Sequence, residues 1–220
     1  MTRKTALLIG ATGLIGNELL KILLKNDAYQ KITVIVRNPL GMTDPKLEEI
    51  VTDFDELDEA LINFHVDDVF SCLGTTIKKA KSQEVMYKID VTYPLKIAQL
   101  TRKVGARQFL FVSSPYANAK SRTFYTRIKG ELEDEVMKID FNSITIFRPS
   151  LLLGKRQEFR LGEHTAGVLF TALSFLFVGP LKKFSGIQGK TVAKAMDKAA
   201  QMNQEGVTIY ELDQIEELGS

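Results

Sequence analysis

Cysteine and histidine are scarce in this sequence. Cys72 is the one cysteine, and His65 and His164 are the two histidines. A single thiol excludes an internal disulfide framework and a thiolate metal cluster, and the histidines have no acidic or cysteine partner at metal-ligand spacing. We therefore expect no metal site. Sparse cysteine favours a reducing compartment, so we expect a cytoplasmic protein in which Cys72 is a packing residue.

An excess of charge of either sign is also missing. The chain has 29 lysines and arginines against 27 aspartates and glutamates, which gives a formal net charge of +2. Such a balance creates no global field that would recruit nucleic acid or an anionic membrane. We expect no nucleic-acid partner, and any anion site must be local.

Long hydrophobic runs are lacking too. The uncharged stretch at residues 166–181 is shorter than the roughly 20 residues of a spanning helix, and Gly167, Gly179 and Pro180 interrupt it. The opening MTRKTALLIG has no signal-peptide cleavage pattern. We expect no stable membrane insertion. The stretch fits a buried helix, the wall of a substrate lobe or a subunit interface, which leaves a homodimer or a protein partner open.

Apolar runs rich in Val, Ile and Phe alternate with helical patterns along most of the chain. The runs are TALLIG, KITVIVR, EIVTDF, DVFSCLG, RQFLFVSS, SITIFRP and VTIYEL. Strand, helix, strand repetition predicts an α/β fold with a doubly wound parallel sheet, and the continuous hydrophobicity of LLI, TVIV and LFV places those strands in its interior. Helical spacing predicts helices over residues 14–26, 83–104, 126–139 and 191–203.

The rhythm changes after about residue 150. A polar loop with Arg156 and Arg160 precedes the apolar stretch and the last helix. We predict a single domain over residues 1–220, with a small C-terminal substrate lobe drawn mainly from residues 150–190. The two arginines suit an anionic substrate and equally a solvated loop.

Glycine recurs at i, i+3 and i+6 in GATGLIG, between a predicted strand and a predicted helix. In a doubly wound sheet this turn seats the pyrophosphate of a dinucleotide, because the helix N-terminus offers unpaired N–H groups and a partial positive charge. Glycine lets the backbone turn sharply or lie against a phosphate. A tight turn alone is the alternative. The predicted cofactor-binding residues of this turn are Gly10, Thr12, Gly13, Leu14, Ile15 and Gly16.

The next two strands indicate which dinucleotide binds. KITVIVRNP carries Arg37 at the strand end, where an acid would bind a ribose 2'-hydroxyl and an arginine can pair with a 2'-phosphate. Arg37 therefore favours NADP(H) over NAD(H), with a solvated surface arginine as the alternative. Asp53 and Phe54, after the third strand, are predicted to flank the adenine, and an ordinary loop acid is an equal alternative.

Tyr125 and Lys129 in FYTRIKGELE are one helical turn apart, so both side chains lie on one helix face. A nearby ammonium favours the phenolate and lowers the tyrosine pKa, which suits the pair to proton transfer. Ser113 and Ser114 end a buried strand, where residues face the ligand crevice. We predict that Ser114 acts with the Tyr125–Lys129 pair. Ser113 is predicted to contact the cofactor or, alternatively, to take the role of Ser114. A surface helix and a capped turn are the structural alternatives.

Together these segments resemble a known family. GATGLIG, Arg37, SCLGTT at 71–76, Ser114, Tyr125 with Lys129, and FRPSLLLGKRQEFRLGE at 147–163 are similar to the atypical or extended short-chain dehydrogenase/reductase superfamily. Within it, the likeness is to the NAD(P)H-binding branch that contains the human Tat-interacting metastasis suppressor protein and its bacterial relatives. The resemblance covers nearly the whole chain and implies a Rossmann fold that binds NADP(H).

Carried over by position, the resemblance implies roles for individual residues. Tyr125 would be the general acid/base, Lys129 would hold the nicotinamide ribose, and Ser114 would orient a small-molecule substrate. The cofactor would also be lined by Leu73, Gly74, Thr75, Pro149 and Ser150.

Three functions are compatible with these residues. The leading hypothesis is an NADPH-dependent oxidoreductase that moves hydride to or from a small carbonyl or alcohol. The second is an NADPH-binding regulatory or redox-sensing protein that acts through a partner. The weaker third is an epimerase or dehydratase, for which the C-terminal lobe is short.

Overall fold

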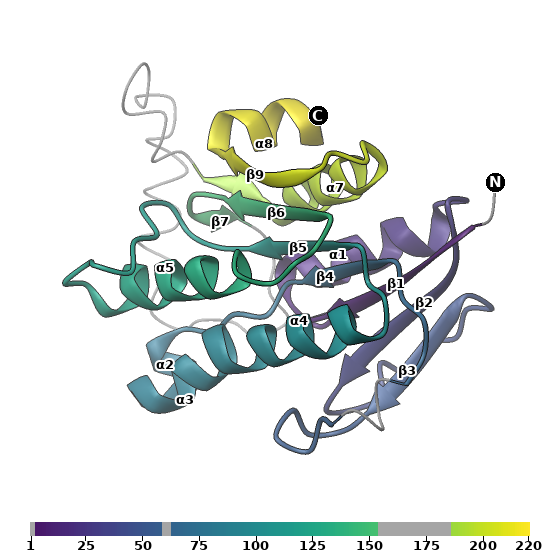
Figure 1. The fold of residues 1–220 in the computed structure, drawn as a ribbon, viewed down its shortest axis with the longest axis horizontal. Helices are drawn as coiled ribbons and strands as arrows, with labels where there is room; N and C mark the ends of the chain where they lie inside the picture. The colour runs from purple at the N-terminus through teal and green to yellow at the C-terminus, as the bar shows by residue number, and fades with distance from the viewer. Residues whose placement is uncertain (1–2, 59–62, 154–185) are drawn as a thin grey trace.

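A sheet of seven parallel strands forms the centre of the structure (Figure 1). The computed structural model describes residues 3–58, 63–153 and 186–220. In spatial order the strands are β3 (Leu47–Val51), β2 (Tyr29–Val36), β1 (Lys4–Ile9), β4 (Asp68–Ser71), β5 (Gln108–Val112), β6 (Ser143–Arg148) and β9 (Gly206–Glu211). The predicted α/β fold with a doubly wound parallel sheet is confirmed, and each strand overlaps one of the apolar runs.

The inner strands are buried on both faces. Leu7, Leu8 and Ile9 of β1 are fully buried, as are Phe109 and Phe111 of β5. The edge strands β3 and β9 carry exposed residues between the inward-facing ones. This difference explains why the interior runs are continuously apolar and the two edge runs contain charged residues.

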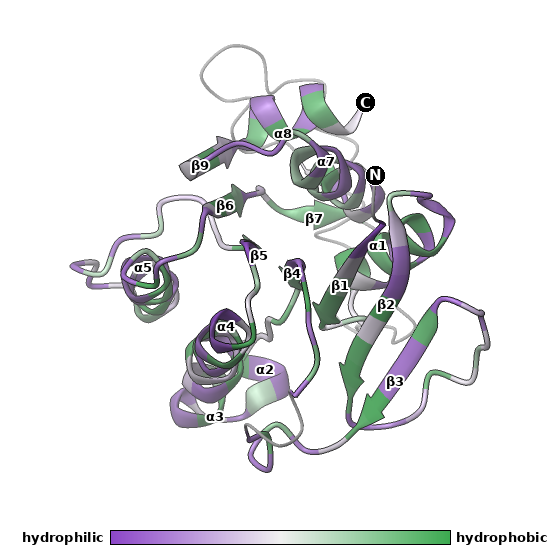
Figure 2. Cartoon of the chain, turned by 45° about the vertical axis from the view of Figure 1, so that its right-hand side comes forward, coloured by the Kyte–Doolittle hydropathy of each residue, from purple (hydrophilic) through white to green (hydrophobic). Residues whose placement is uncertain are grey.

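Helices cover both faces of the sheet (Figure 2). One face packs against α1 (Leu14–Lys25) and α7 (Gly189–Gln201), and α8 (Leu212–Gly219) rests on α7. The other face packs against α4 (Tyr93–Lys103) and α5 (Phe124–Val136), beside the short helices α2 (Ile77–Ala80) and α3 (Gln83–Tyr87). Two hydrophobic cores result, one on each side of the sheet, and both are built from apolar helix stripes at the spacing that the sequence showed.

The helix predicted over residues 83–104 is present, but its middle part is not an α-helix. Between α3 and α4 the backbone forms a π-helix, η1 (Lys88–Thr92). A π-helix is rare and often occurs at a functional site, because the extra residue per turn turns a side chain away from the regular helical stripe. Asp90 and Val91 of η1 are both buried.

Other departures from the prediction are small. The helix predicted over 126–139 runs from Phe124 to Val136, and α8 was not anticipated. A short parallel pair, β7 (Leu152–Leu153) with β8 (Ile187–Gln188), stands apart from the main sheet. Most of the proposed substrate lobe, including Arg156, Arg160, His164 and the stretch 166–181, lies outside the described residues.

Within the described residues, no helix is both long enough and apolar enough to cross a membrane. Those same ranges contain no group of three or more His, Cys, Asp or Glu side chains that could hold a metal ion.

Candidate functional site

The strand order changes direction beside β1. The chain proceeds from β1 outward to β2 and β3 and then returns to place β4 on the other side of β1. In open parallel sheets this switch point leaves a crevice at the carboxyl ends of the strands, where ligands bind. The residues that follow β1, β2, β4, β5 and β6 therefore meet at one edge of the sheet.

The turn after β1 is held in place by Gly10 and Gly16. Gly10 has a φ of +82°, and a Cβ there would come within 2.5 Å of the carbonyl carbon of Cys72. A Cβ on Gly16 would overlap the carbonyl oxygen of Gly10. Both glycines are thus required by close contacts within the protein, between the turn, the first turn of α1 and the end of β4.

Gly13 differs from these two glycines. Its φ of −78° suits any residue, and a Cβ there would lie 3.2 Å from the oxygen of Gly10, a tight but tolerable contact. It is the N-cap of α1, and no side chain caps this helix end. The first N–H groups of α1 therefore remain available to an anion, and the absence of a Cβ keeps the approach to them open.

The side chains between these glycines face different ways. Ile15 is 5% exposed and belongs to the core, while Thr12 is exposed and Leu14 is half-buried. Any contact from Ile15 or Gly16 to a ligand would therefore come from the backbone.

Arg37 follows β2 and is exposed. In the sheet register Ile9 of β1 pairs with Ile35 of β2, so Arg37 lies just beyond the level of the glycine turn, on the neighbouring strand. This position suits a cation that meets the adenosine end of a dinucleotide seated on α1.

Asp53 and Phe54, in the loop after β3, separate in the structure. Asp53 is exposed, and its Oδ1 accepts a hydrogen bond from the Asp55 N–H at 3.0 Å. Phe54 is 6% exposed and its ring stacks on Tyr93 with centroids 5.3 Å apart. Phe54 is therefore a core residue whose ring is already stacked, so only Asp53 presents its side chain to solvent.

The loop after β4 lies against the glycine turn and against α5. The Thr75 N–H donates to Asp90 Oδ2 at 2.9 Å. A Cβ on Gly74 would lie 3.5 Å from Asp90 Oδ1 and 3.9 Å from Lys129 Nζ. Leu73, Gly74 and Thr75 are thus brought to the crevice, with Asp90 behind them. Asp90 was not anticipated as part of this site.

The two serines after β5 have different surroundings. Ser113 Oγ is hydrogen-bonded to Glu133 Oε1 at 2.5 Å. Ser114 is only 3% exposed, and its Oγ has no hydrogen-bond partner among the described residues. Leaving a buried hydroxyl unpaired costs about 1–3 kcal/mol, so such a group needs an explanation.

Tyr125 and Lys129 lie in the first two turns of α5, as the spacing predicted. Tyr125 is 40% exposed, whereas Lys129 is 2% exposed and its Nζ lies 2.7 Å from Asp90 Oδ1. Burial on its own would lower the pKa of Lys129, but the negative charge of Asp90, with contributions from Tyr125 and Glu133, outweighs burial and raises it. Lys129 is therefore a fixed cation beside the loop after β4.

A second ion-pair network lies behind the serines. Glu133, one helical turn after Lys129, binds the Arg148 guanidinium through both carboxylate oxygens. Arg148 also donates to Glu211 Oε1 at 3.1 Å, which ties α5 to β6 and β9. Pro149 follows directly and is buried. This network fixes Ser113 and the end of β6. In the sequence its one visible sign is the charge of Glu133 on a buried helix face.

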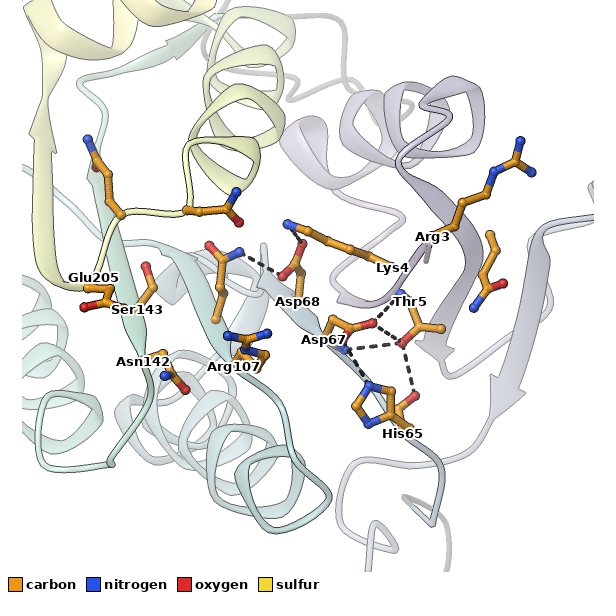
Figure 3. Close-up of a pocket in the computed structure, with 14 residues that line it drawn as sticks. Arg3, Lys4, Thr5, His65, Asp67, Asp68, Arg107, Asn142, Ser143 and Glu205 are labelled. Atoms are coloured by element: carbon orange, nitrogen blue, oxygen red, sulfur yellow. Dashed lines mark hydrogen bonds and ion pairs between the residues drawn. The ribbon is translucent and has the colours of Figure 1, made fainter. Parts of the chain in front are cut away.

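A polar hollow of about 570 Å³ lies at the opposite end of the sheet (Figure 3). Two of its acidic side chains have partners inside it: Asp67 accepts from the Thr5 N–H, and Asp68 accepts from Lys4 at 3.1 Å. Gln108 donates to Asp68 as well. The hollow lies at the amino ends of the strands, away from the crevice at the carboxyl ends, so it is not the predicted cofactor site.

Cys72 packs beside the glycine turn, with Sγ 3.9 Å from the Met196 sulfur. Burial raises the pKa of its thiol to about 12. The thiol is protonated at neutral pH, in keeping with a packing residue and not a nucleophile.

The family model for NAD dependent epimerase/dehydratases matches residues 6–173. The chain belongs to the NAD dependent epimerase/dehydratase family. Its switch-point crevice, uncapped α1 and glycine turn are the features by which such a Rossmann-type member would hold a dinucleotide.

Two curated relatives illustrate the likeness of this family member. Protein HTATIP2 of Rattus norvegicus is 37% identical over 177 residues, which cover 79% of this chain and 73% of that protein. Protein FMP52-1, mitochondrial, of Scheffersomyces stipitis is 32% identical over 225 residues, 97% of this chain and 98% of the relative. The predicted relationship to the branch that contains the Tat-interacting protein is confirmed.

Solved structures of this epimerase/dehydratase fold are similar at low sequence identity. MoeE5 in complex with UDP-glucose and NAD aligns with a TM-score of 0.70 and 14% identity, over 96% of this chain and 79% of that one. The UDP-N-acetylglucosamine 4-epimerase from Methanobrevibacter ruminantium M1 has a TM-score of 0.70 and 18% identity, over 96% and 77%. At such identities the likeness establishes the fold alone.

The expected cytoplasmic location is wrong. The FMP52 relatives from Scheffersomyces stipitis, Debaryomyces hansenii and Emericella nidulans are named mitochondrial proteins. Cysteine content reports the redox conditions that a chain tolerates, and a single free thiol does not separate one reducing compartment from another.

Proposed function

We propose that this chain is an NADP(H)-dependent oxidoreductase of the short-chain dehydrogenase/reductase type, acting on a small carbonyl or alcohol. Tyr125 is the general acid/base, Lys129 holds the nicotinamide ribose, and Ser114 binds the reacting oxygen of the substrate. The finer points of this proposal, the phosphorylated cofactor and the catalytic tyrosine, go beyond the family description.

The observation that carries the proposal is the unpaired hydroxyl of Ser114. It is buried at the carboxyl end of β5, where ligands bind in a sheet of this kind. Ser113 is engaged by Glu133, so Ser114 is the serine with a free donor and acceptor. A substrate carbonyl or alcohol oxygen would complete its hydrogen bonding.

The cofactor fits the remaining groups of the crevice. The uncapped start of α1 and the open approach over Gly13 suit a pyrophosphate. Arg37 suits a 2'-phosphate, which favours NADP(H). Lys129 forms an ion pair with Asp90, with its Nζ 2.7 Å from Oδ1, and its ammonium N–H groups suit ribose hydroxyls. When bound, the nicotinamide ring would supply or accept the hydride.

The chain's own residues then carry the proton. In carbonyl reduction Ser114 donates a hydrogen bond to the carbonyl oxygen, which polarises the C=O bond. The Tyr125 hydroxyl donates its proton to the same oxygen as hydride reaches the carbon. The fixed ammonium of Lys129 stabilises the phenolate that remains. In alcohol oxidation the same groups act in reverse.

Turnover with and without the Tyr125 hydroxyl tests the function. We expect the purified protein to oxidise NADPH with some member of a broad carbonyl panel, and Tyr125→Phe to lower kcat by roughly 10²–10⁴-fold, the usual contribution of a general acid. NADPH binding is expected to persist in the variant. Tyr87 on α3 is 39% exposed, so Tyr87→Phe is a control of similar exposure outside the site. Absence of NADPH oxidation across the panel, with Tyr125→Phe unchanged, would refute the proposal.

The family description keeps a second function in view. Epimerases and dehydratases of this fold can work by transient oxidation, in which the cofactor is regenerated in each cycle. A chain of that kind would retain its dinucleotide through purification and would consume no NADPH.

NADPH binding without any turnover, together with a protein partner whose affinity responds to NADPH, would favour the regulatory role instead.

A further inference from the structure

Asp90 is a buried carboxylate in the π-helix between α3 and α4. It is 1% exposed, and η1 packs against α3 and α5. The apolar face of this segment also contains Met86 and Ile97, both buried. An aspartate in such a stripe is costly unless its charge is matched, so its partners explain why it is tolerated.

Each carboxylate oxygen of Asp90 has its own partner on a different element. Oδ1 lies 2.7 Å from Lys129 Nζ on α5, and Oδ2 accepts the Thr75 N–H of the loop after β4 at 2.9 Å. One carboxylate thus bridges a side chain and a backbone segment that are more than fifty residues apart in the chain.

The charges around Lys129 make Asp90 its principal counter-ion. Tyr125 and Glu133 face Lys129 from α5, Asp90 faces it from η1, and the backbone of Gly74 approaches from the loop after β4. Glu133 is already neutralised by two contacts with Arg148. Without Asp90, the buried ammonium would keep no close carboxylate of its own among the described residues.

We propose that Asp90 is a positioning residue whose carboxylate ties Lys129 to the loop after β4, so that these two cofactor-facing segments keep one fixed relative position. The role in cofactor binding rests on the proposed function. The bridge itself is a property of the ligand-free protein and is independent of that function.

The bridge requires a carboxylate at this position. Lys129 Nζ lies at one oxygen of Asp90 and the Thr75 N–H at the other. The single amide oxygen of an asparagine can occupy only one of these two positions, so its N–H₂ group would face the other donor. We expect Asp90→Asn to release one of the two segments. The loop that contains Gly74 and Thr75 would then lose its fixed distance from Lys129.

Asp68 supplies a matched control. It is also 1% exposed and also pairs with a lysine, Lys4, but at the amino end of the sheet. Asp68→Asn and Asp90→Asn both remove one buried charge, and both are expected to lower stability. Only Asp90→Asn is expected to weaken NADPH binding, by roughly 10- to 100-fold, the value of a lost hydrogen bond to a charged group. In steady-state assays this loss falls mainly on KM for NADPH.

Amide hydrogen exchange at Thr75 reads the bridge without any cofactor. We expect its exchange to rise about tenfold or more in Asp90→Asn and to stay within about twofold of wild type in Asp68→Asn. Lys129→Gln, which leaves Asp90 and Thr75 intact, should also raise it, because the carboxylate loses its anchor on α5. If Asp90→Asn does not fold, Thr75 exchange in Lys129→Gln tests the bridge instead.

The outcomes separate the bridge from the function. Unchanged Thr75 exchange in Asp90→Asn, or an equal rise in Asp68→Asn, overturns the bridge. If Thr75 responds as expected while NADPH affinity falls equally in both variants, the positioning role for the cofactor is overturned. If wild-type protein binds no NADPH, the proposed function fails, and Thr75 exchange still decides the bridge.

Discussion

At the scale of single residues, the three glycines of GATGLIG have separate causes. Gly10 and Gly16 are required by contacts inside the protein, whereas Gly13 has an ordinary φ and a Cβ there would make a tight but tolerable contact. The spacing in the sequence predicts the turn, but it cannot sort the glycines, because the clash partner of Gly10 is the backbone of Cys72, far away in the chain. The described contacts do not require a glycine at position 13, and the proposed pyrophosphate would supply a reason for it.

This difference predicts that one substitution lowers stability and that another lowers NADPH affinity. Gly16→Ala drives a Cβ into the Gly10 carbonyl, so we expect it to lower the free energy of unfolding by about 1–3 kcal/mol or more. Gly13→Ala should fold with nearly normal stability and weaken NADPH binding about tenfold or more. Urea unfolding and NADPH titration measure the two quantities. Normal NADPH affinity in Gly13→Ala would remove the glycine turn from the binding site.

In the proposed function, Arg37 is the residue that distinguishes NADPH from NADH. It is exposed at the end of β2, beside the turn. We expect Arg37→Ala to weaken NADPH binding by about 1.5–3 kcal/mol, the value of a charged hydrogen bond, and to leave NADH binding nearly unchanged. Calorimetric titrations of both cofactors provide the comparison. Equal losses for NADPH and NADH would mean that Arg37 does not meet a 2'-phosphate.

At the scale of elements, a buried polar clasp joins α7 to the start of the sheet. Asp68 of β4 accepts hydrogen bonds from Lys4 and from the Tyr29 hydroxyl, the latter at 2.6 Å. Lys4 and Gln108 also donate to the Ala200 carbonyl of α7. Strands that begin far apart in the chain are thereby fixed to α7.

The clasp predicts an alkaline loss of stability. Burial, followed by the charge of Asp68, raises the pKa of Tyr29 well above its ordinary value. The folded state therefore keeps the Tyr29 proton that the unfolded chain releases above about pH 10, so stability falls as pH rises beyond that point. Tyr29→Phe should cost about 1.5–3 kcal/mol at pH 7 through the lost bond to Asp68 and then decline less steeply above pH 10.

Urea midpoints at pH 7 and at alkaline pH measure this difference. Tyr116→Phe is the control, because Tyr116 is 63% exposed and outside the clasp. Parallel alkaline declines in wild type and Tyr29→Phe would show that Tyr29 does not carry the effect.

Some of the helices and strands could be predicted from the sequence, and others could not. The strands were predictable because interior parallel strands are continuously apolar, and α1 because its apolar residues recur at helical spacing. The acid-rich helix α8 was missed because it follows β9 without a break and its N-cap, Glu211, is also the last residue of that strand. The π-helix and the Asp90–Lys129 pair were missed because a contact between distant residues leaves no local pattern.

The candidate site residues stay predictions, and the structure adds surroundings that the sequence could not show. Ser113 and Ser114 were indistinguishable in sequence, and the Glu133 contact separates them. Phe54 was expected beside an adenine, but its ring is stacked on Tyr93 in the core. An aromatic residue after a strand suits a core and a ligand equally well, so only its neighbours decide between the two.

At the scale of the whole molecule, the amino and carboxyl ends of the parallel strands differ in the polar groups that they carry. The amino ends of the strands carry the polar clasp, whose charges satisfy one another. The carboxyl ends carry an uncapped helix, an exposed arginine and an unpaired buried serine. These unsatisfied groups lie where the fold places a dinucleotide, and they are the basis of the oxidoreductase proposal.

A crystal structure of the protein with NADPH tests this account most directly. We expect the pyrophosphate against Gly13 and the first N–H groups of α1, with the 2'-phosphate at Arg37. The open face of the nicotinamide ring should be turned toward Tyr125 and Ser114. NADPH bound elsewhere, such as in the polar hollow at the amino ends, or no NADPH bound at saturating concentration, would contradict it.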